Sequence, residues 1–253
     1  NDLEQVIRIG KVQLEGGSLR MTKNDSLPNK LFLSLQEMKL ENVLINEETS
    51  KLDLPFDFEN FTFSSDSLDL AMDGHHKILV KELELGKEDL RIAGFRILPL
   101  FSKKEFDNRI PFEKDRYELN IKEINFRNFT WDYEKDTLQV SSPETIVENA
   151  HFEVYRNKTL PDDQRIKPLY SQLLREMGTK LNFDLIQIKN SRIAYEEKVE
   201  VERPPGVLKF DDLDVSLYNI TNVNLNSPDF PRTQIKAKAQ FMEEAPLTMD
   251  LEF

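Results

Sequence analysis

Apolar and polar residues alternate in short runs along most of the chain, and one irregular spacing recurs. In the stretch 181–195, two alternating apolar pairs are separated by a step of three residues: Leu181 and Phe183, then Ile186 and Ile188. After the polar residues 189–192, Ile193 and Tyr195 resume the alternation. Alternation with period two is typical of strands with one apolar face, and Asn and Ser favour turns. The stretch therefore predicts two strands joined by a tight hairpin.

The same spacing begins again at several places along the chain. The copies start at Ile7, Leu33, Phe56, Ile78, Leu119, Thr145, Leu181 and Leu208. Most starts are separated by a similar interval, and the two longer intervals contain insertions. Such self-similarity indicates one supersecondary unit that is repeated along an axis.

The step of three residues within each copy has two explanations. In a regular strand it would move the second apolar pair to the opposite face, whereas a one-residue bulge restores the face and bends the strand. The alternative is a two-residue turn, but the step residues are poor formers of such turns: Gln36-Glu37, Lys81-Glu82 and Lys122-Glu123. We therefore expect each unit to be a long bent strand, a tight turn and a shorter return strand. The turns are expected at Gly16-Gly17, Glu41-Asn42, Ser64–Ser67, Gly86–Asp89 and Arg127-Asn128.

Two inserts interrupt the regular spacing of the repeat copies. The insert 99–117 is charged and reads as a long loop with one helical turn at Ser102–Phe106. The insert 157–180 predicts a helix that has Pro168 in its first turn, Gly178 at its C-terminus and one apolar face formed by Leu169, Leu173, Leu174 and Met177. Near the end of the chain, residues 233–243 and 247–253 are expected to form a closing hairpin with Pro246 between them.

About a dozen strands with an apolar face and one short helix predict an all-β fold, in which the sheet must bury or shelter that face. A sandwich, a closed barrel and a curled sheet that forms a trough are all compatible with the pattern. Because periodic bulges favour curvature, we expect a long curved antiparallel meander of bulged hairpins that forms a trough or open sandwich. Residues 1–253 are expected to be one β-repeat domain, taken from a longer chain because the pattern is already under way at the first residues.

The amino-acid composition excludes several classes of function. Charged residues make up 32% of the chain and the net charge is -12, which opposes binding to polyanionic nucleic acid. There is no cysteine, so disulfides and Cys-ligated metals are excluded. No apolar run reaches the length of about 20 residues that a membrane helix needs.

No residue constellation indicates a reaction. The pair His75-His76 would point to opposite faces of a strand, so a polar turn is a better explanation than a metal site. His151 is isolated in a predicted strand and is expected to be a surface or packed residue. Nucleophilic triads, a glycosidase carboxylate pair and phosphate loops are unsupported. We therefore expect a protein that is not an enzyme and has no cofactor or metal.

The phenylalanine-rich and leucine-rich stripe is the remaining candidate site. Such a stripe is usually a packed core, but on a trough it would be an open surface for an apolar ligand. Its candidate residues are Leu33, Leu35, Phe56, Phe58, Phe61, Phe63, Ile78, Val80, Ile121, Phe126, Phe183, Ile186, Ile188 and Phe210.

Several short phrases resemble the AsmA-like superfamily, in the form found in large envelope proteins of Bacteroidota. They are Leu98–Phe106 with Lys114-Asp115-Arg116, Val154–Lys158, Ile186–Tyr195, Gly206–Phe210 and Asn219–Asn222. The resemblance implies a repeating β-groove related to TamB and the bridge-like lipid transfer proteins. It also implies a periplasmic location, an inner-membrane tether outside this sequence, and a role in moving phospholipid or maintaining the outer membrane. No catalytic residues carry over.

From this resemblance we expect phospholipid or fatty acyl chains as partners, lying against the apolar stripe, and other envelope proteins as further candidates. A scaffold or protein-interaction domain with a fully packed core is the alternative, and a carbohydrate-active enzyme on a β-sandwich is a third reading. The scaffold predicts no accessible apolar channel. The enzyme predicts a polar pocket with two close carboxylates.

Overall fold

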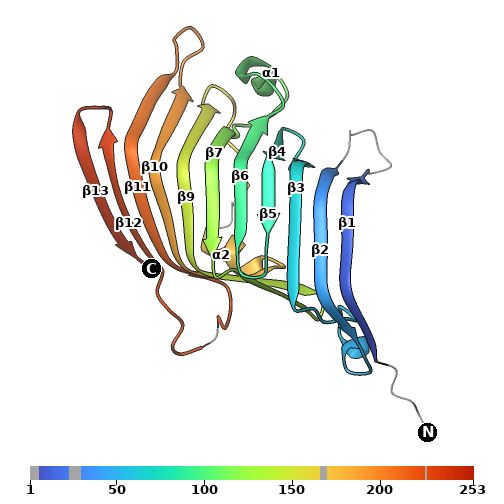
Figure 1. The fold of residues 1–253 in the computed structure, drawn as a ribbon. Helices are drawn as coiled ribbons and strands as arrows, with labels where there is room; N and C mark the ends of the chain where they lie inside the picture. The colour runs from blue at the N-terminus through green and yellow to red at the C-terminus, as the bar shows by residue number, and fades with distance from the viewer. Residues whose placement is uncertain (1–5, 23–29, 166–169, 226) are drawn as a thin grey trace.

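The computed structural model describes residues 6–22, 30–165, 170–225 and 227–253. These residues form a single curved sheet of 13 strands with two short helices and one 3-10 turn at its ends (Figure 1). The strands before the long crossover are β1 (Ile7–Met21), β2 (Leu31–Ile45), β3 (Asn60–Ala71), β4 (His76–Val80), β5 (Glu82–Leu85), β6 (Leu90–Pro99), β7 (Arg116–Arg127), β8 (Thr130–Glu134) and β9 (Thr137–Asn157). After it come β10 (Lys180–Lys198), β11 (Gly206–Thr221), β12 (Gln234–Phe241) and β13 (Ala245–Glu252).

The strands follow one another across the sheet almost in chain order. The order is β1-β2-β3-β4-β6-β7-β9-β10-β11-β12-β13, while β5 pairs with β3 and β6, and β8 pairs with β9. The two ends of this order, β1 and β13, do not pair with each other, so the sheet is not closed into a barrel. The expected all-β fold with a long curved sheet is thus confirmed.

The expectation of a purely antiparallel meander is wrong at one place, because β9 and β10 are parallel. The insert 157–180 is the connection between them. A parallel pair needs a crossover that returns the chain to the starting end of the sheet, and this insert is long enough for that path. Its helix α2 (Tyr170–Glu176) lies near the ends of β7 and β9 in Figure 1.

Several strands keep their apolar residues on one face by passing through an irregular position where the alternation is interrupted, either at a step of three or at a predicted turn. Gly16 (φ 64), Gly94 (φ 62), Asn149 (φ 54), Asn190 (φ 51) and Asp212 (φ 48) have left-handed backbone conformations inside strands. Gly94 of β6 and Asn149 of β9 each lie opposite the step residue Lys122 of β7. None of these three residues forms a regular pair in the β6·β7 or β7·β9 hydrogen-bond ladder. True register shifts occur between β2 and β3, β10 and β11, and β11 and β12. The bent strand that the pattern predicted is therefore present, although a left-handed residue often replaces the extra bulge residue.

Several predicted turns are wrong. The stretch 181–195 is not a hairpin but part of β10, a continuous strand of 19 residues. The predicted turns at Gly16-Gly17, Glu41-Asn42 and Ser64–Ser67 also lie inside strands. Gly and Asn tolerate positive φ, which both a turn and a bent strand use. At Gly16, Asn42 and Asn190 the left-handed residue bends the strand without reversing it. Ser64–Ser67 has no left-handed residue, and there the register between β2 and β3 shifts instead.

Other connections follow the prediction. Gly86 donates from its backbone to the Asp89 carbonyl at 2.8 Å between β5 and β6, and Asn128 has positive φ between β7 and β8. The closing hairpin is formed by β12 and β13, but Pro246 lies in β13 and the turn is at residues 242–244. Helix α1 (Lys103–Asp107) begins after Ser102, which caps it together with Glu105.

The helix predicted in the second insert is present as α2, but its apolar face differs from the prediction. Pro168 and Leu169 lie outside the described residues. Leu173 and Met177 are 46% and 44% exposed, so the expected apolar face of α2 is not buried. The short 3-10 turn η1 (Thr49–Lys51) was not expected.

Candidate functional site

The apolar residues of successive strands are in register and form long rows across one face of the sheet. One row of paired residues runs from β1 to β12 through Met21, Leu31, Leu70, Ile78, Ile97, Leu119, Phe152, Ile193, Phe210 and Phe241. A second runs from β1 to β13 through Leu14, Met38, Phe63, Leu85, Leu90, Phe126, Thr145, Ile186, Leu217, Ile235 and Leu251. Paired residues on neighbouring strands share a face. We call this surface the apolar face and the other surface the polar face.

All the sequence-predicted site residues lie on or beside the apolar face. The strand residues among them are members of the two rows or of parallel rows: Leu33, Leu35, Phe61, Phe63, Ile78, Val80, Ile121, Phe126, Ile186, Ile188 and Phe210. Phe183 joins them because its ring centroid lies 6.0 Å from that of Phe126. Phe56 and Phe58 are not in a strand, but the Phe58 ring lies 5.8 Å from Phe61.

Most of the apolar face is half-buried, and no second layer of described structure lies over it. Among the described residues, few apolar side chains are buried, and several of the buried ones lie at the bends: Val80, Val147, Leu213 and Ala239. Side chains crowd on the inside of a bend, so this burial indicates that the strands bend toward the apolar face. At the outer strands, Leu19 of β1 and Leu247 of β13 are 51% and 45% exposed. The face is therefore the lining of a groove that stays open at β1 and β13.

The groove is partly closed where the strands end near η1. Here the strand β8 bends across toward β3, and the Trp131 ring lies edge-on to Phe61 with centroids 6.1 Å apart. The backbone N–H of Lys135 donates to Asp53 at 2.7 Å and anchors this hairpin to the loop after η1. A cavity of about 690 Å³ lies between these segments and is lined by residues that include Phe56, Phe58, Phe61, Trp131, Tyr133, Lys51, Lys87 and Lys135. We call it the aromatic recess.

Sequence reasoning missed part of the aromatic recess. Trp131 and Phe129 belong to the fifth copy of the repeat, but they were not among the candidate residues. Phe129 is buried, and its ring lies 5.7 Å from Phe126. The signal that could have identified them is the clustering of aromatic residues just after the turn at Arg127-Asn128.

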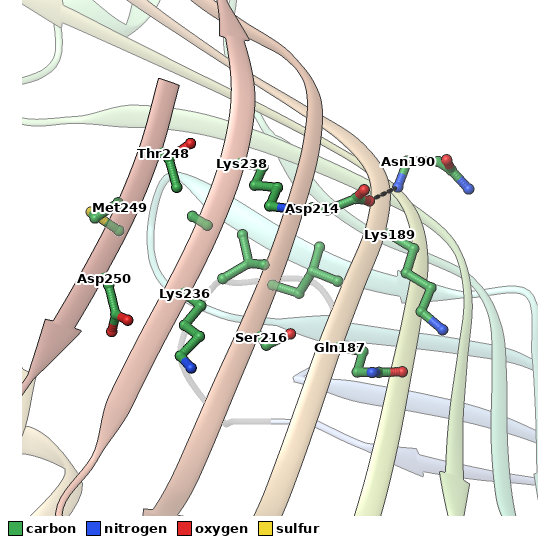
Figure 2. Close-up of a pocket in the computed structure, with 13 residues that line it drawn as sticks. Gln187, Lys189, Asn190, Asp214, Ser216, Lys236, Lys238, Thr248, Met249 and Asp250 are labelled. Carbon is green, nitrogen blue, oxygen red and sulfur yellow. Dashed lines mark hydrogen bonds between the residues drawn. The ribbon is translucent and has the colours of Figure 1, made fainter. Parts of the chain in front are cut away.

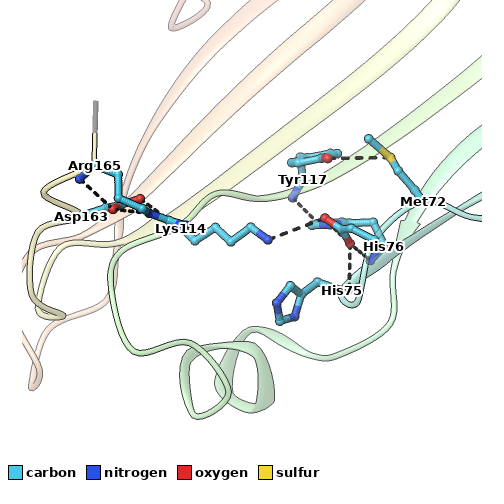
Figure 3. A network of polar contacts seen from close by, with 8 residues as sticks. Met72, His75, His76, Lys114, Tyr117, Asp163 and Arg165 are labelled. Atoms are coloured by element: carbon cyan, nitrogen blue, oxygen red, sulfur yellow. Dashed lines mark hydrogen bonds and ion pairs between the residues drawn. The ribbon is translucent and has the colours of Figure 1, made fainter. Parts of the chain in front are cut away.

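The opposite strand ends, near α1, are closed by a polar and aromatic cluster (Figure 3). His76 is fully buried and stacks on Tyr117 at 4.0 Å between ring centroids. Its Nδ1 lies 3.2 Å from Asp73, while its Nε2 accepts the backbone N–H of Tyr117 at 3.3 Å. The fully buried Phe106 of α1 packs on the rings of His75 and His76.

Burial lowers the pKa values of His75 and His76. Burial opposes ionisation of Asp73, but hydrogen bonds from the His75 and His76 backbones and from the His76 ring outweigh it and lower the Asp73 pKa. This balance favours a neutral imidazole beside an ionised carboxylate. The residues therefore form a packed, hydrogen-bonded strand end. The predicted polar turn is correct for Asp73, Gly74 and His75, whereas His76 is the first residue of β4. Nowhere in the described ranges do three His, Cys, Asp or Glu side chains gather to hold a metal ion.

The polar face carries charges of both signs in cross-strand pairs. Arg91 donates to Glu123 at 2.9 Å and also lies within 3.4 Å of Glu82 and 3.3 Å of Glu84. Figure 2 shows the shallow hollow on this face over β10 to β13, about 520 Å³ in volume, where Asp214 accepts the Asn190 backbone N–H at 3.0 Å. Lys236 and Lys238 of β12 lie directly opposite Asp250 of β13 and Asp214 of β11, respectively, and these side chains are exposed to water.

Comparisons with family models, curated proteins and solved structures found no match to this chain. Of the helices in the described ranges, none is long and apolar enough to cross a bilayer. The apolar face is therefore the feature of the described structure that bears most directly on function.

Proposed function

We propose that this chain is a non-enzymatic lipid-binding module that holds acyl chains of phospholipids or fatty acids on the apolar face. The observation that carries the proposal is the pair of apolar rows that cross the sheet from β1 to β12 and from β1 to β13 with no layer of described structure above them. Soluble proteins rarely expose apolar patches larger than a few hundred Å² unless the patch binds something.

The shape of the surface favours an extended ligand. A continuous row of Leu, Ile and Phe side chains suits a long unbranched chain better than a compact molecule. Each buried methylene contributes about 0.8 kcal/mol, so a chain that spans a few strands has enough contact to leave a membrane. The charged polar face keeps the other side of the sheet in water.

The resemblance to AsmA-like envelope proteins supports the same reading. With it we propose a periplasmic location and a part in lipid transfer or outer-membrane maintenance, with other envelope proteins as further partners. The scaffold alternative requires a fully packed core, and the half-buried rows argue against it.

The only tryptophan, Trp131, provides a direct test because it lies in the aromatic recess. We expect fatty acids or phospholipids with brominated acyl chains to quench its fluorescence, because bromine quenches only at close contact. In the control Trp131→Phe/Tyr218→Trp, the reporter moves to the polar face, where Lys236 lies 5.9 Å from the Tyr218 ring. This reporter is expected to remain unquenched.

Native mass spectrometry with lipid extraction of the same sample is the second measurement. Bound phospholipid or fatty acid supports the proposal. Equal quenching of both reporters, or no quenching together with a lipid-free mass, would overturn it and favour the scaffold.

A further inference from the structure

Within the described residues, the outer edge of β1 is a long stretch of backbone that pairs with no other strand. In the part of the chain that the structure describes, no strand lies beside this edge, and β1 has 15 residues without a proline. Exposed strand edges are templates for pairing with another strand unless a charge, proline or covering segment protects them. The apolar side chains of Ile7, Leu14 and Leu19 are about half exposed along it.

We propose that two copies of this chain pair through β1, antiparallel, about a two-fold axis at Gln13. A closed two-fold dimer is the commonest form of homo-oligomer. The pairing would join the two sheets edge to edge and carry the apolar face from one copy into the other.

The positions of the irregular residues select this register. The β1·β2 ladder skips Gly10 with its partner Asn42, and Gly16 with its partner Gln36; Asn42 and Gly16 have positive φ. The alternation of faces therefore changes at residues 10 and 16, which are equally far from Gln13. Pairing centred on Gln13 places Gly10 of one copy opposite Gly16 of the other, so the apolar side chains stay on one face along the whole interface. A pairing shifted by one residue would place apolar side chains of one copy beside polar ones of the other.

The charges of β1 are complementary in the same register. Lys11 of one copy lies opposite Glu15 of the other, on the polar face, and the contact occurs twice by symmetry. On the apolar face, Val12 lies opposite Leu14. Opposite charges in directly facing positions favour pairing and like charges oppose it.

The other edge, β13, is less suited to pairing with itself. It carries Pro246, which cannot donate a backbone hydrogen bond, and the acidic residues Asp250 and Glu252. The proposed β1 pairing does not depend on lipid binding, and it would extend the apolar face whatever that face binds.

A single cysteine tests the register, because the chain has none of its own. In Gln13→Cys the two introduced thiols lie on the axis, with Cα atoms about 4.5–5.5 Å apart as in any directly opposed pair, which a disulfide can span. Under mild oxidation we expect rapid formation of a covalent dimer. The matched control is Thr248→Cys at the other edge, and equally fast or faster dimer formation there would overturn the proposal.

Sedimentation equilibrium of the cysteine-free protein at physiological salt tests the dimer itself. We expect a dimer for the wild type, dissociation for Lys11→Glu, which faces Glu15, and recovery for Lys11→Glu/Glu15→Lys. Circular dichroism would check that each variant keeps its β-structure. A wild type that stays monomeric at all concentrations, or a dimer that Lys11→Glu leaves intact, would contradict this interface.

Discussion

At the scale of single residues, the curvature of the sheet depends on a few backbone positions with positive φ. Gly16, Gly94, Asn149, Asn190 and Asp212 interrupt the alternation in their strands and keep the apolar side chains on one face. Only Gly adopts this conformation without a steric cost, and Asn and Asp tolerate it best among the others. The residue types that the sequence uses at the bends therefore follow from backbone sterics.

Gly94 is the most constrained of these positions. Its φ is 62°, and an added Cβ would lie 2.8 Å from the Lys81 Cβ. We expect Gly94→Ala to lower the free energy of unfolding by about 1–3 kcal/mol. Denaturant unfolding would measure the change, with Gly74→Ala as the control because nothing lies within 4 Å of its added Cβ. Equal stability of the two variants would show that the bend at Gly94 is not strained.

Stability should depend on pH through His76. Because burial lowers its pKa from the ordinary 6.5, the unfolded chain takes up a proton at a higher pH than the folded chain. The contribution of neutral His76 to the free energy of unfolding should therefore be complete above pH 6.5. It should decrease as the pH falls from 6.5 toward the lower pKa of the folded state. Urea unfolding at several pH values would measure this slope. His76→Gln should reduce it, leaving the part due to His75, whereas an unchanged slope would rule out His76 as its source.

At the scale of elements, the loop that contains α1 is held to the strand ends by specific contacts. Arg156 of β9 makes two hydrogen bonds of 2.6 Å to Asp115, and Tyr155 donates to Asp107 at 2.8 Å. Ser102 and Glu105 form a capping box at the start of the helix. A helix of 5 residues is too short to be stable alone, so packing against the sheet must maintain it.

Phe106 should be the residue that anchors α1, since it is fully buried against His75 and His76. We expect Phe106→Ala to cost about 3–5 kcal/mol of unfolding free energy. Hydrogen exchange would show the accompanying loss of protection in residues 103–107. Lys104→Ala, on the exposed side of the same helix, should change stability by no more than about 0.5 kcal/mol. Similar effects of the two substitutions would contradict an anchoring role.

At the scale of the whole molecule, the decisive feature is a sheet with one sheltered apolar face and one charged face. Phe61 and Thr62 are neighbours in β3 that lie on the apolar and polar faces, respectively. We expect Phe61→Asp to weaken uptake of a fluorescent phospholipid roughly tenfold or more, equivalent to about 1.4 kcal/mol. A charge on the groove lining must be desolvated when an acyl chain covers it.

Thr62→Asp is the matched control, since it adds the same charge on the polar face, opposite Lys39. It should leave uptake unchanged. Lipid titration followed by fluorescence would measure both variants, after circular dichroism has shown that both are folded. Equal loss of uptake in the two variants would argue against binding on the apolar face.

The sequence by itself determined which stretches are extended, which of their residues share the apolar face and where the alternation is interrupted, because the alternation and the left-handed residue types are local properties. The candidate residues chosen from this pattern all lie on or beside that face, although Trp131 and Phe129 were missed. Tertiary structure alone decided whether Asn190-Ser191 reverses the chain or bends it, because both conformations use the same positive φ. It also decided the parallel pairing of β9 with β10 and the approach of Trp131 to Phe61. These contacts join residues far apart in the sequence, and their register depends on the path of the whole sheet, which no local pattern contains.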